Sequence, residues 1–237
     1  MNKKHLQEIE NIKALLLCGG EGTRLHPLTK KIPKPLVKIK NKTIIDHIIE
    51  HLHKSGLREF LICSGYKSNL ISRHFREYKS LDAKIINSGK VDILTRILDC
   101  KSMIDNDFMI CYGDTIANVN IEKLYAFHKS HSRIATVCSY QLKQNFGIIE
   151  KNDENLVISF NEKPEYPGSI NIGYFIFNKN IFKHTHSVNN WLDLINILIE
   201  KKQLYSYEHD GIHITINTLN ELALAEKSID LYLNTLK

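Results

Sequence analysis

Three glycines stand within four positions, directly after a short apolar run. The run KALLL at residues 13–17 continues into a segment that ends on Arg24. Glycine lets a backbone approach a ligand closely, and successive N–H groups after a strand can bind phosphate. The Arg24 guanidinium can bind a phosphate through two parallel hydrogen bonds. The pattern predicts a phosphate-binding loop formed by Leu17, Cys18, Gly19, Gly20, Glu21, Gly22 and Thr23. For the glycines alone, a turn without a ligand is the alternative.

Lys34 and Asp114 stand where the chain limits their freedom. Lys34 lies between Pro33 and Pro35, and proline fixes φ, so its ammonium can be held near a phosphate. Asp114 follows the apolar run DFMIC at residues 107–111, where an acidic side chain is costly without a partner. Mg²⁺ usually binds one or two carboxylates together with phosphates and waters, so Asp114 is the predicted metal ligand. A solvated lysine and an Asx turn are the alternatives.

These residues need a scaffold, and short apolar runs alternate with helical patterns through the first 140 residues. Strands separated by helices predict βαβ units and a mainly parallel sheet flanked by helices, an α/β fold. The carboxyl ends of such strands are where ligands bind. The expected strands are residues 13–17, 59–63, 83–87, 107–111 and 134–140, and the expected helices are residues 43–54, 69–78, 92–104 and 121–131.

The pattern changes after residue 140. Runs at 147–150, 156–161 and 170–177 have short connections, which predicts a small antiparallel addition to the same sheet. Thr218 and Glu221 fit the capping-box spacing at the start of a last helix. The remaining expected elements are a helix at 191–202, strands at 204–209 and 213–217, and a helix at 218–236. No linker or repeat interrupts residues 1–237, so a single domain is predicted.

Composition excludes several classes of protein. The 237 residues are 43% hydrophobic and 24% charged, with a net charge of +6, which suits a packed domain with a polyanionic ligand. No run of five lysines or arginines occurs, so no nucleic-acid partner is expected. Five cysteines without a Cys-x-x-Cys pattern favour a reducing, cytoplasmic setting over disulfides or zinc. No apolar stretch is long enough to cross a membrane, so no membrane partner is expected.

Histidines could suggest a metal site on one helix. His47 and His51 have the i, i+4 spacing that can bind zinc. The glutamate that an H-E-x-x-H site requires does not follow His47. A solvated or partly buried helix face is therefore the expectation.

The string LCGGEGTRLHPLTKKIPKPLV at residues 17–37 resembles the signature loop of the sugar-1-phosphate nucleotidylyltransferases, a family with a Rossmann-like fold. YGD at 112–114, EKP at 162–164 and NIG at 171–173 are similar to further motifs of that family. Within it, the chain is most similar to the glucose-1-phosphate cytidylyltransferases. The resemblance implies transfer of CMP from CTP to a phosphorylated small molecule, with Mg²⁺ as cofactor and pyrophosphate as the second product.

The resemblance also implies roles. Arg24 contacts the β- and γ-phosphates, Lys34 neutralises charge during transfer, and Asp114 binds the metal. Residues 12–140 form the nucleotide-binding half and residues 141–237 the acceptor-binding half. Further nucleotide contacts are expected from Asn87, Ser88, Gly89 and Gly113, and acceptor contacts from Glu162, Lys163 and Asn171. Relatives are often oligomers, so a homo-oligomer is an expectation.

Two departures from the family pattern concern the acceptor. Asn217 stands where many members have a second metal-binding aspartate, so it is at most a weak second ligand. The glycine-rich stretch usual before the third helix is replaced by SGKVDILTR at 88–96. Both suggest an acceptor other than a hexose 1-phosphate. The similar CTP:phosphoglutamine cytidylyltransferases of capsule phosphoramidate biosynthesis make L-glutamine phosphate one candidate and a sugar 1-phosphate the other. A regulatory module that binds nucleotide without catalysis is the alternative function.

Overall fold

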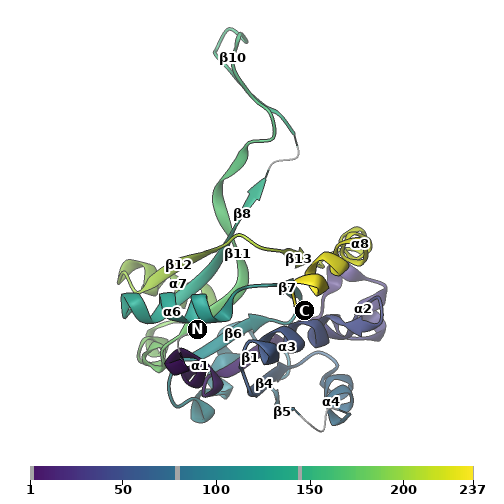
Figure 1. Ribbon diagram of the computed structural model, residues 1–237, viewed down its shortest axis with the longest axis vertical. Coiled ribbons are helices and arrows are strands. Elements are labelled where there is room, and N and C mark those ends of the chain that lie inside the picture. Colours follow the sequence, from purple (N-terminus) through teal and green to yellow (C-terminus); the bar gives the residue numbers. More distant parts are fainter. Residues whose placement is uncertain (1–2, 78–80, 144–145, 237) are drawn as a thin grey trace.

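The computed structural model describes residues 3–77, 81–143 and 146–236. Its centre is a seven-stranded sheet with strand order β12-β8-β11-β6-β1-β4-β5 (Figure 1). The strands are β1 (Lys13–Cys18), β4 (Glu59–Ser64), β5 (Asp82–Asn87), β6 (Phe108–Tyr112), β8 (Ala135–Lys143), β11 (Glu165–Phe177) and β12 (Leu204–His209). β6, β1, β4 and β5 are parallel, and β11 runs antiparallel to both β6 and β8. The prediction of a mixed, mainly parallel sheet is confirmed.

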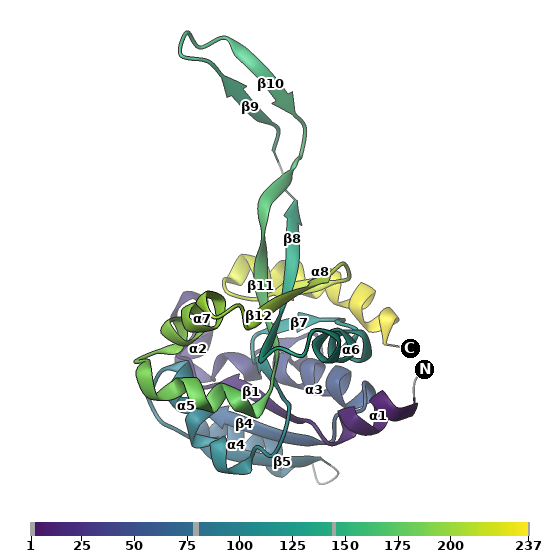
Figure 2. The ribbon, with the colours of Figure 1, turned by 90° about the vertical axis from the view of Figure 1, so that its left-hand side faces the viewer.

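Alternate residues of β1 point to opposite faces of this sheet. Ala14 and Leu16 enter one apolar cluster, and Leu15 enters the other. Strands covered on both faces read as continuous apolar runs, which explains the sequence KALLL. The two faces are covered by different helices (Figure 2).

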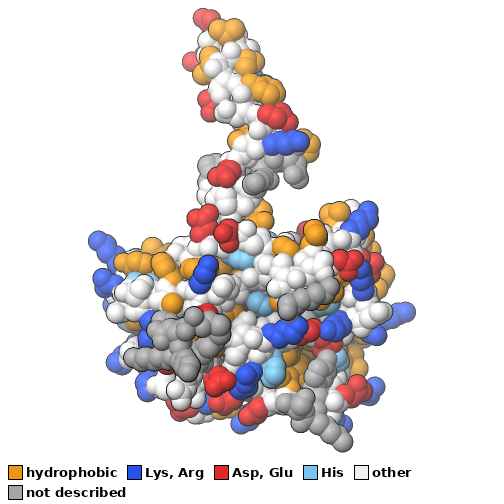
Figure 3. Space-filling view, in the orientation of Figure 1, with side chains coloured by type: hydrophobic (Ala, Val, Ile, Leu, Met, Phe, Trp, Pro, Cys, Tyr) orange, Lys and Arg blue, Asp and Glu red, His pale blue; other side chains and the backbone are white. Residues whose placement is uncertain are grey.

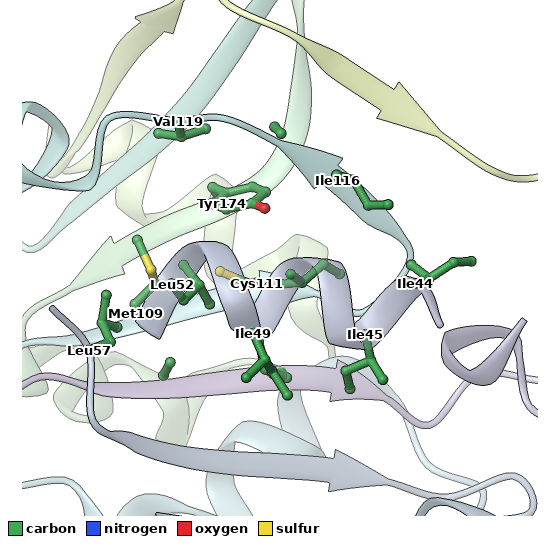
Figure 4. Packing of buried hydrophobic residues seen from close by; sticks show 14 of the residues in the cluster. Ile44, Ile45, Ile49, Leu52, Leu57, Met109, Cys111, Ile116, Val119 and Tyr174 are labelled. Carbon is green, nitrogen blue, oxygen red and sulfur yellow. The ribbon is translucent and has the colours of Figure 1, made fainter. Parts of the chain in front are cut away.

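The helices on the two faces follow their sequence patterns. Thr43 is the N-cap of α3 (Ile44–Lys54), and its side chain forms a capping box with that of Asp46. Ile45, Ile49 and Leu52 then point from one face of α3 toward the sheet (Figure 4). The other main helices are α4 (Ser68–Arg76), α5 (Ile93–Asp99), α6 (Ile121–His131), α7 (Trp191–Glu200) and α8 (Leu219–Thr235). The sequence patterns did not predict the short helices α1 (Lys3–Glu10) and α2 (Leu28–Lys31).

A small second sheet joins distant parts of the chain beside the main sheet. β7 (Thr115–Ala117) pairs antiparallel with β13 (His213–Thr215), with Thr115 opposite Thr215. β7 follows Asp114 directly and β13 ends two residues before Asn217. This pairing therefore brings Asp114 and Asn217 to the same end of the sheet.

The described residues 146–165 form a projecting arm. Beyond the body, β9 (Ile148–Lys151) and β10 (Val157–Asn161) form a separate two-stranded sheet that stands away from the molecule (Figures 1 and 2). The predicted antiparallel addition to the main sheet is confirmed for β11 and wrong for β9 and β10. An apolar alternation identifies a strand but does not select its pairing partner, and β9 and β10 pair only with each other.

Buried polar side chains correct one further expectation. His47 and His51 are only 2% and 5% exposed, so the solvated or partly buried face expected for them is wrong. His51 Nε2 lies 3.0 Å from the backbone oxygen of Val119, and burial lowers the pKa of His51 to about 4. All five cysteines are buried with free thiols. Within the described ranges, no helix is both long and apolar enough to span a bilayer.

Candidate active site

A cavity of about 470 Å³ opens at the carboxyl ends of β1 and β6. Leu17 is in register with Tyr112 across these parallel strands, and the Gly113 N–H donates to the Leu17 oxygen at 3.1 Å. A Cβ at Gly113 would lie 2.6 Å from Cys18 Sγ, so only glycine permits this close approach. The lining residues are Leu17, Cys18, Gly19, Gly20, Gly22, Thr23, Arg24, Lys34, Pro35, Val91, Asp92, Ile93, Arg96, Tyr112, Gly113, Asp114 and Asn217.

The cavity wall carries a cluster of charged and amide groups. Lys34 Nζ donates to Asp114 Oδ2 at 2.6 Å and to Asn217 Oδ1 at 2.9 Å. Arg24 Nη2 donates to the same Asn217 oxygen at 2.9 Å. The four residues come from four separate segments, and the structure brings them together at one point. Two cations beside one carboxylate leave this corner electropositive and suited to phosphate.

Proline geometry and burial hold Lys34 in this cluster. Pro33 is extended and Pro35 lies inside the short 3-10 turn Lys34–Leu36. The Lys34 side chain is only 9% exposed. A buried ammonium needs ionic or hydrogen-bonding partners, and Asp114 and Asn217 supply them.

Asp114 and Asn217 are the oxygen donors that could hold a metal. Their contacts with Lys34 place the Asp114 carboxylate and the Asn217 amide oxygen on one side of the cavity. Within the described ranges, no group of three or more His, Cys, Asp or Glu side chains could bind a metal by itself. One carboxylate and one amide oxygen still fit Mg²⁺, because this ion takes its other ligands from phosphates and waters.

Sequence reasoning missed Arg96, a buried cation behind the glycine-rich loop. Arg96 is 5% exposed, and its described hydrogen-bond partners are four backbone oxygens. Nη1 donates to Ser64 at 2.6 Å, and Nη2 lies 2.8 Å from Gly89, 3.1 Å from Val91 and 3.3 Å from Gly19. Arg96 thus ties together the three loops around the cavity.

The position of Arg96 also explains why residue 19 of the loop is a glycine. A Cβ at Gly19 would lie 2.1 Å from Arg96 Cζ, so the guanidinium occupies the space that a side chain would need. The helical spacing of residues 93–99 could have indicated that Arg96 lies on the same side of the helix as the half-buried Ile93, but an arginine there is ordinarily solvated.

The residues expected near the base are not part of the cavity lining. Asn87 Oδ1 accepts the Gly89 N–H at 3.1 Å, and the Ser88 hydroxyl is buried without a partner among the described residues. Val91 and Asp92 line the cavity in their place. Glu21, which is also outside the lining, pairs with Lys90 at 3.0 Å.

None of the three expected acceptor residues lines the cavity itself. Glu162 and Lys163 lie on the arm, between β10 and β11. Asn171 lies in β11, where its side-chain oxygen accepts the Gly173 N–H at 2.7 Å. It also stands beside Tyr112, a lining residue. Burial raises the pKa of Tyr112, and hydrogen bonds with Asn171 and Trp191 oppose that shift.

An aromatic group supports this side of the site. Trp191 packs edge-on against Phe175 at 5.5 Å and Phe177 at 5.9 Å between ring centroids. Its contact with Tyr112 links the start of α7 to the cavity wall.

Known proteins share this architecture and sequence. A family model described as nucleotidyl transferase matches residues 13–211. A Bacillus subtilis protein described as a probable glucose-1-phosphate cytidylyltransferase is 31% identical, covering 91% of this chain and 95% of its own. The glucose-1-phosphate cytidylyltransferase of Salmonella typhimurium is 28% identical with the same coverage.

Structural similarity supports the fold. A Bacillus anthracis protein described as a "putative glucose-1-phosphate thymidylyltransferase", in complex with sucrose, has a TM-score of 0.73 at 19% identity, covering 91% of this chain and 94% of its own. HddC from Yersinia pseudotuberculosis has a TM-score of 0.71 at 20% identity, with coverages of 92% and 99%. With the family model matching most of the chain, the resemblance seen in the sequence is confirmed, and the protein belongs to the nucleotidyl transferase family.

Proposed function

We propose that this protein is a Mg²⁺-dependent cytidylyltransferase, which transfers CMP from CTP to a phosphorylated small molecule and releases pyrophosphate. The reaction class, nucleotidylyl transfer, follows from the family. The observation that carries the proposal is the meeting of Arg24, Lys34, Asp114 and Asn217 at the end of β1 and β6. The cytidylyltransferases among the relatives support CTP as the nucleotide.

The chemistry requires little covalent help from the protein. A phosphate oxygen of the acceptor attacks the α-phosphorus, the bond to the bridging oxygen breaks, and pyrophosphate leaves with its electron pair. Positioning and neutralisation of charge dominate such a step. We assign neutralisation of the α-phosphate to Lys34, whose side chain is buried in the cluster, and binding of the departing phosphates to the more exposed Arg24.

Mg²⁺ would be held by Asp114, with Asn217 as a weak second donor. When bound, the ion neutralises phosphate charge and polarises the phosphoryl oxygens. Lys34 donates to both side chains, so it also orients them. Asn217 carries no charge, which favours dependence on one metal ion.

The acceptor is proposed to bind through Glu162, Lys163 and Asn171. Asn217 and the loop at 88–96 depart from the pattern of sugar-using relatives, which favours an acceptor other than a hexose 1-phosphate. The resemblance to the capsule phosphoramidate enzymes makes L-glutamine phosphate one candidate, and a sugar 1-phosphate is the other. The buried free thiols support a reducing, cytoplasmic setting.

A pyrophosphate-release assay tests this function. Four NTPs are each combined with L-glutamine phosphate, glucose 1-phosphate and mannose 1-phosphate, with and without Mg²⁺. We expect turnover with CTP and one acceptor, and none without the metal. CTP binding without any turnover in folded protein would instead support a regulatory module that only binds nucleotide.

Variants of the charged cluster test the assigned roles. Arg24→Ala and Asp114→Asn should each lower kcat by about 10²–10³, the usual cost of one contact to developing charge. Lys42→Ala is the matched control, because Lys42 forms an exposed pair with Glu50 on the surface. Near-normal rates in both cluster variants would refute the roles given to Arg24 and Asp114.

A further inference from the structure

The arm, residues 146–165, presents large apolar side chains to solvent. Phe146 is 78% exposed, Ile149 is 54% exposed, and Ile158 and Phe160 are each 64% exposed. An isolated two-stranded hairpin is marginally stable in water, and contiguous exposed apolar surface usually marks an interaction site. The arm therefore has the composition of a segment that is covered by a partner.

The apolar side chains are not spread evenly around the hairpin. Ile149 is directly opposite Phe160, whereas Glu150 is opposite Ser159. Since successive residues of a strand point to opposite faces, Ile149 and Phe160 share one face, and Glu150 and Ser159 share the other. Ile148, which is 39% exposed, lies on the face of Glu150, so the more exposed apolar side chains lie on the face of Ile149 and Phe160. A hairpin with such a face is suited to burying it.

Charge indicates which partner covers it. Residues 146–165 contain five acidic residues and two lysines, a net charge of −3, so the rest of the chain has a net charge of +9. Figure 3 shows orange and red side chains over the arm and most of the blue side chains over the body. An acidic arm and a basic body on the same chain are complementary, which favours a second copy of this chain as the partner.

The body offers a surface that matches the arm. On α8, Leu224 is 61% exposed and Leu231 is 65% exposed, and the exposed Lys227 lies between them. The spacing i, i+3, i+7 places all three on one face of the helix. This face combines apolar contact area with a cation, as the acidic and apolar arm requires.

We propose that the arm docks on α8 of a second copy, with Ile149 and Phe160 against Leu224 and Leu231, and with Lys227 among the carboxylates of the arm. The tip of the arm points away from its own body in both ribbon views (Figures 1 and 2), so another copy is the one it can reach. In a symmetric dimer each copy supplies one arm and one α8 face, and the contact forms twice. The proposal does not depend on which reaction the cavity catalyses.

Light scattering coupled to size-exclusion chromatography tests the dimer. We expect the wild-type protein at twice the chain mass of 27.4 kDa. Ile149→Asp with Phe160→Asp should elute at the chain mass, and so should Leu224→Asp with Leu231→Asp. All four side chains are exposed, so circular dichroism should be unchanged. The matched control is Ser159→Asp with Asn161→Asp, which adds the same charge to the polar face of the arm and should leave the dimer intact.

Mixing the two monomeric variants separates lost docking from damaged folding. One variant keeps an intact α8 face and the other an intact arm, so the mixture regains one of the two contacts, and its mean mass should rise. A wild-type protein that stays at the chain mass at every concentration overturns the proposal. This is also the result expected if the arm packs against its own body. An arm variant that remains dimeric, or a control that dissociates equally, also overturns it. An α8 variant that remains dimeric refutes α8 as the receiving surface.

Discussion

Replacing Arg96 with methionine removes the buried cation behind the glycine-rich loop while keeping an apolar side chain. Arg96 contacts four carbonyl oxygens, but Nη2 has only two hydrogens for three of them. At most three full hydrogen bonds are therefore lost. Each bond to a charged group contributes about 1.5–3 kcal/mol.

Two effects reduce this loss. The Ser64 oxygen also accepts the Ser88 N–H at 3.2 Å, and the Gly19 oxygen accepts the Tyr66 N–H at 3.1 Å, so neither is left without a partner. Removing a buried cation also recovers several kcal/mol of desolvation cost. We expect Arg96→Met to lower the free energy of unfolding by roughly 2–4 kcal/mol, which corresponds to about 5–15 °C in Tm for a chain of this size.

The same change should weaken nucleotide binding, since Arg96 joins the loops on both sides of the cavity. Lost preorganisation of about 1.4 kcal/mol raises KM for the nucleotide tenfold. Urea denaturation and initial-rate kinetics measure both quantities. Arg58→Met is the matched control, because Arg58 pairs with Glu10 near the surface and is about half exposed, so it should cost less than about 0.5 kcal/mol. Equal urea midpoints for the two variants would refute the reasoning.

Three further results are expected. Gly19→Ala should destabilise the wild-type protein and cost less on the Arg96→Met background, because the clash at 2.1 Å is with the guanidinium; equal costs in a double-mutant cycle would contradict this. Asn217→Asp should lower the Mg²⁺ concentration for half-maximal activity by at least about tenfold, since two unit charges ~4 Å apart attract by roughly 1 kcal/mol in bulk water and roughly 4 kcal/mol near a protein surface; a metal titration that does not shift would exclude Asn217 as a ligand. Burial lowers the pKa of His51, His128 and His213 to about 4, whereas the unfolded groups titrate near 6.5. The unfolded state then binds more protons between these values, so stability should fall as the pH drops from 6.5 toward 4, by up to about 1.4 kcal/mol per pH unit per histidine; urea midpoints that are equal at pH 7 and pH 5 would contradict it.

The part of the site that the sequence could predict is the part built from local signals. The glycines after β1, the prolines around Lys34 and the strand before Asp114 each have a short-range pattern with a physical reason. Their meeting follows from the parallel sheet, because the ends of β1 and β6 lie side by side. A few local patterns and one topological rule are enough to assemble this corner.

Other features depend on long-range contacts that carry no local signal. Asn217 is placed by the pairing of β7 with β13, two strands of three residues each that are nearly 100 positions apart. Arg96 is buried only because carbonyls of three loops surround it, and its type alone predicts a surface position. The strands of the arm are visible in the sequence as short apolar runs, but their separation from the main sheet is not.

Trp191 gives the wild-type protein an internal optical reporter. It is the only tryptophan in the chain, so the indole fluorescence arises from one place. That place is beside Tyr112 on the cavity wall, against Phe175 and Phe177. Indole emission shifts with the polarity around the ring, and a ligand that displaces Tyr112 changes its contact with Trp191. Nucleotide affinity can therefore be read by titration of unlabelled, unmodified protein, before any acceptor is identified.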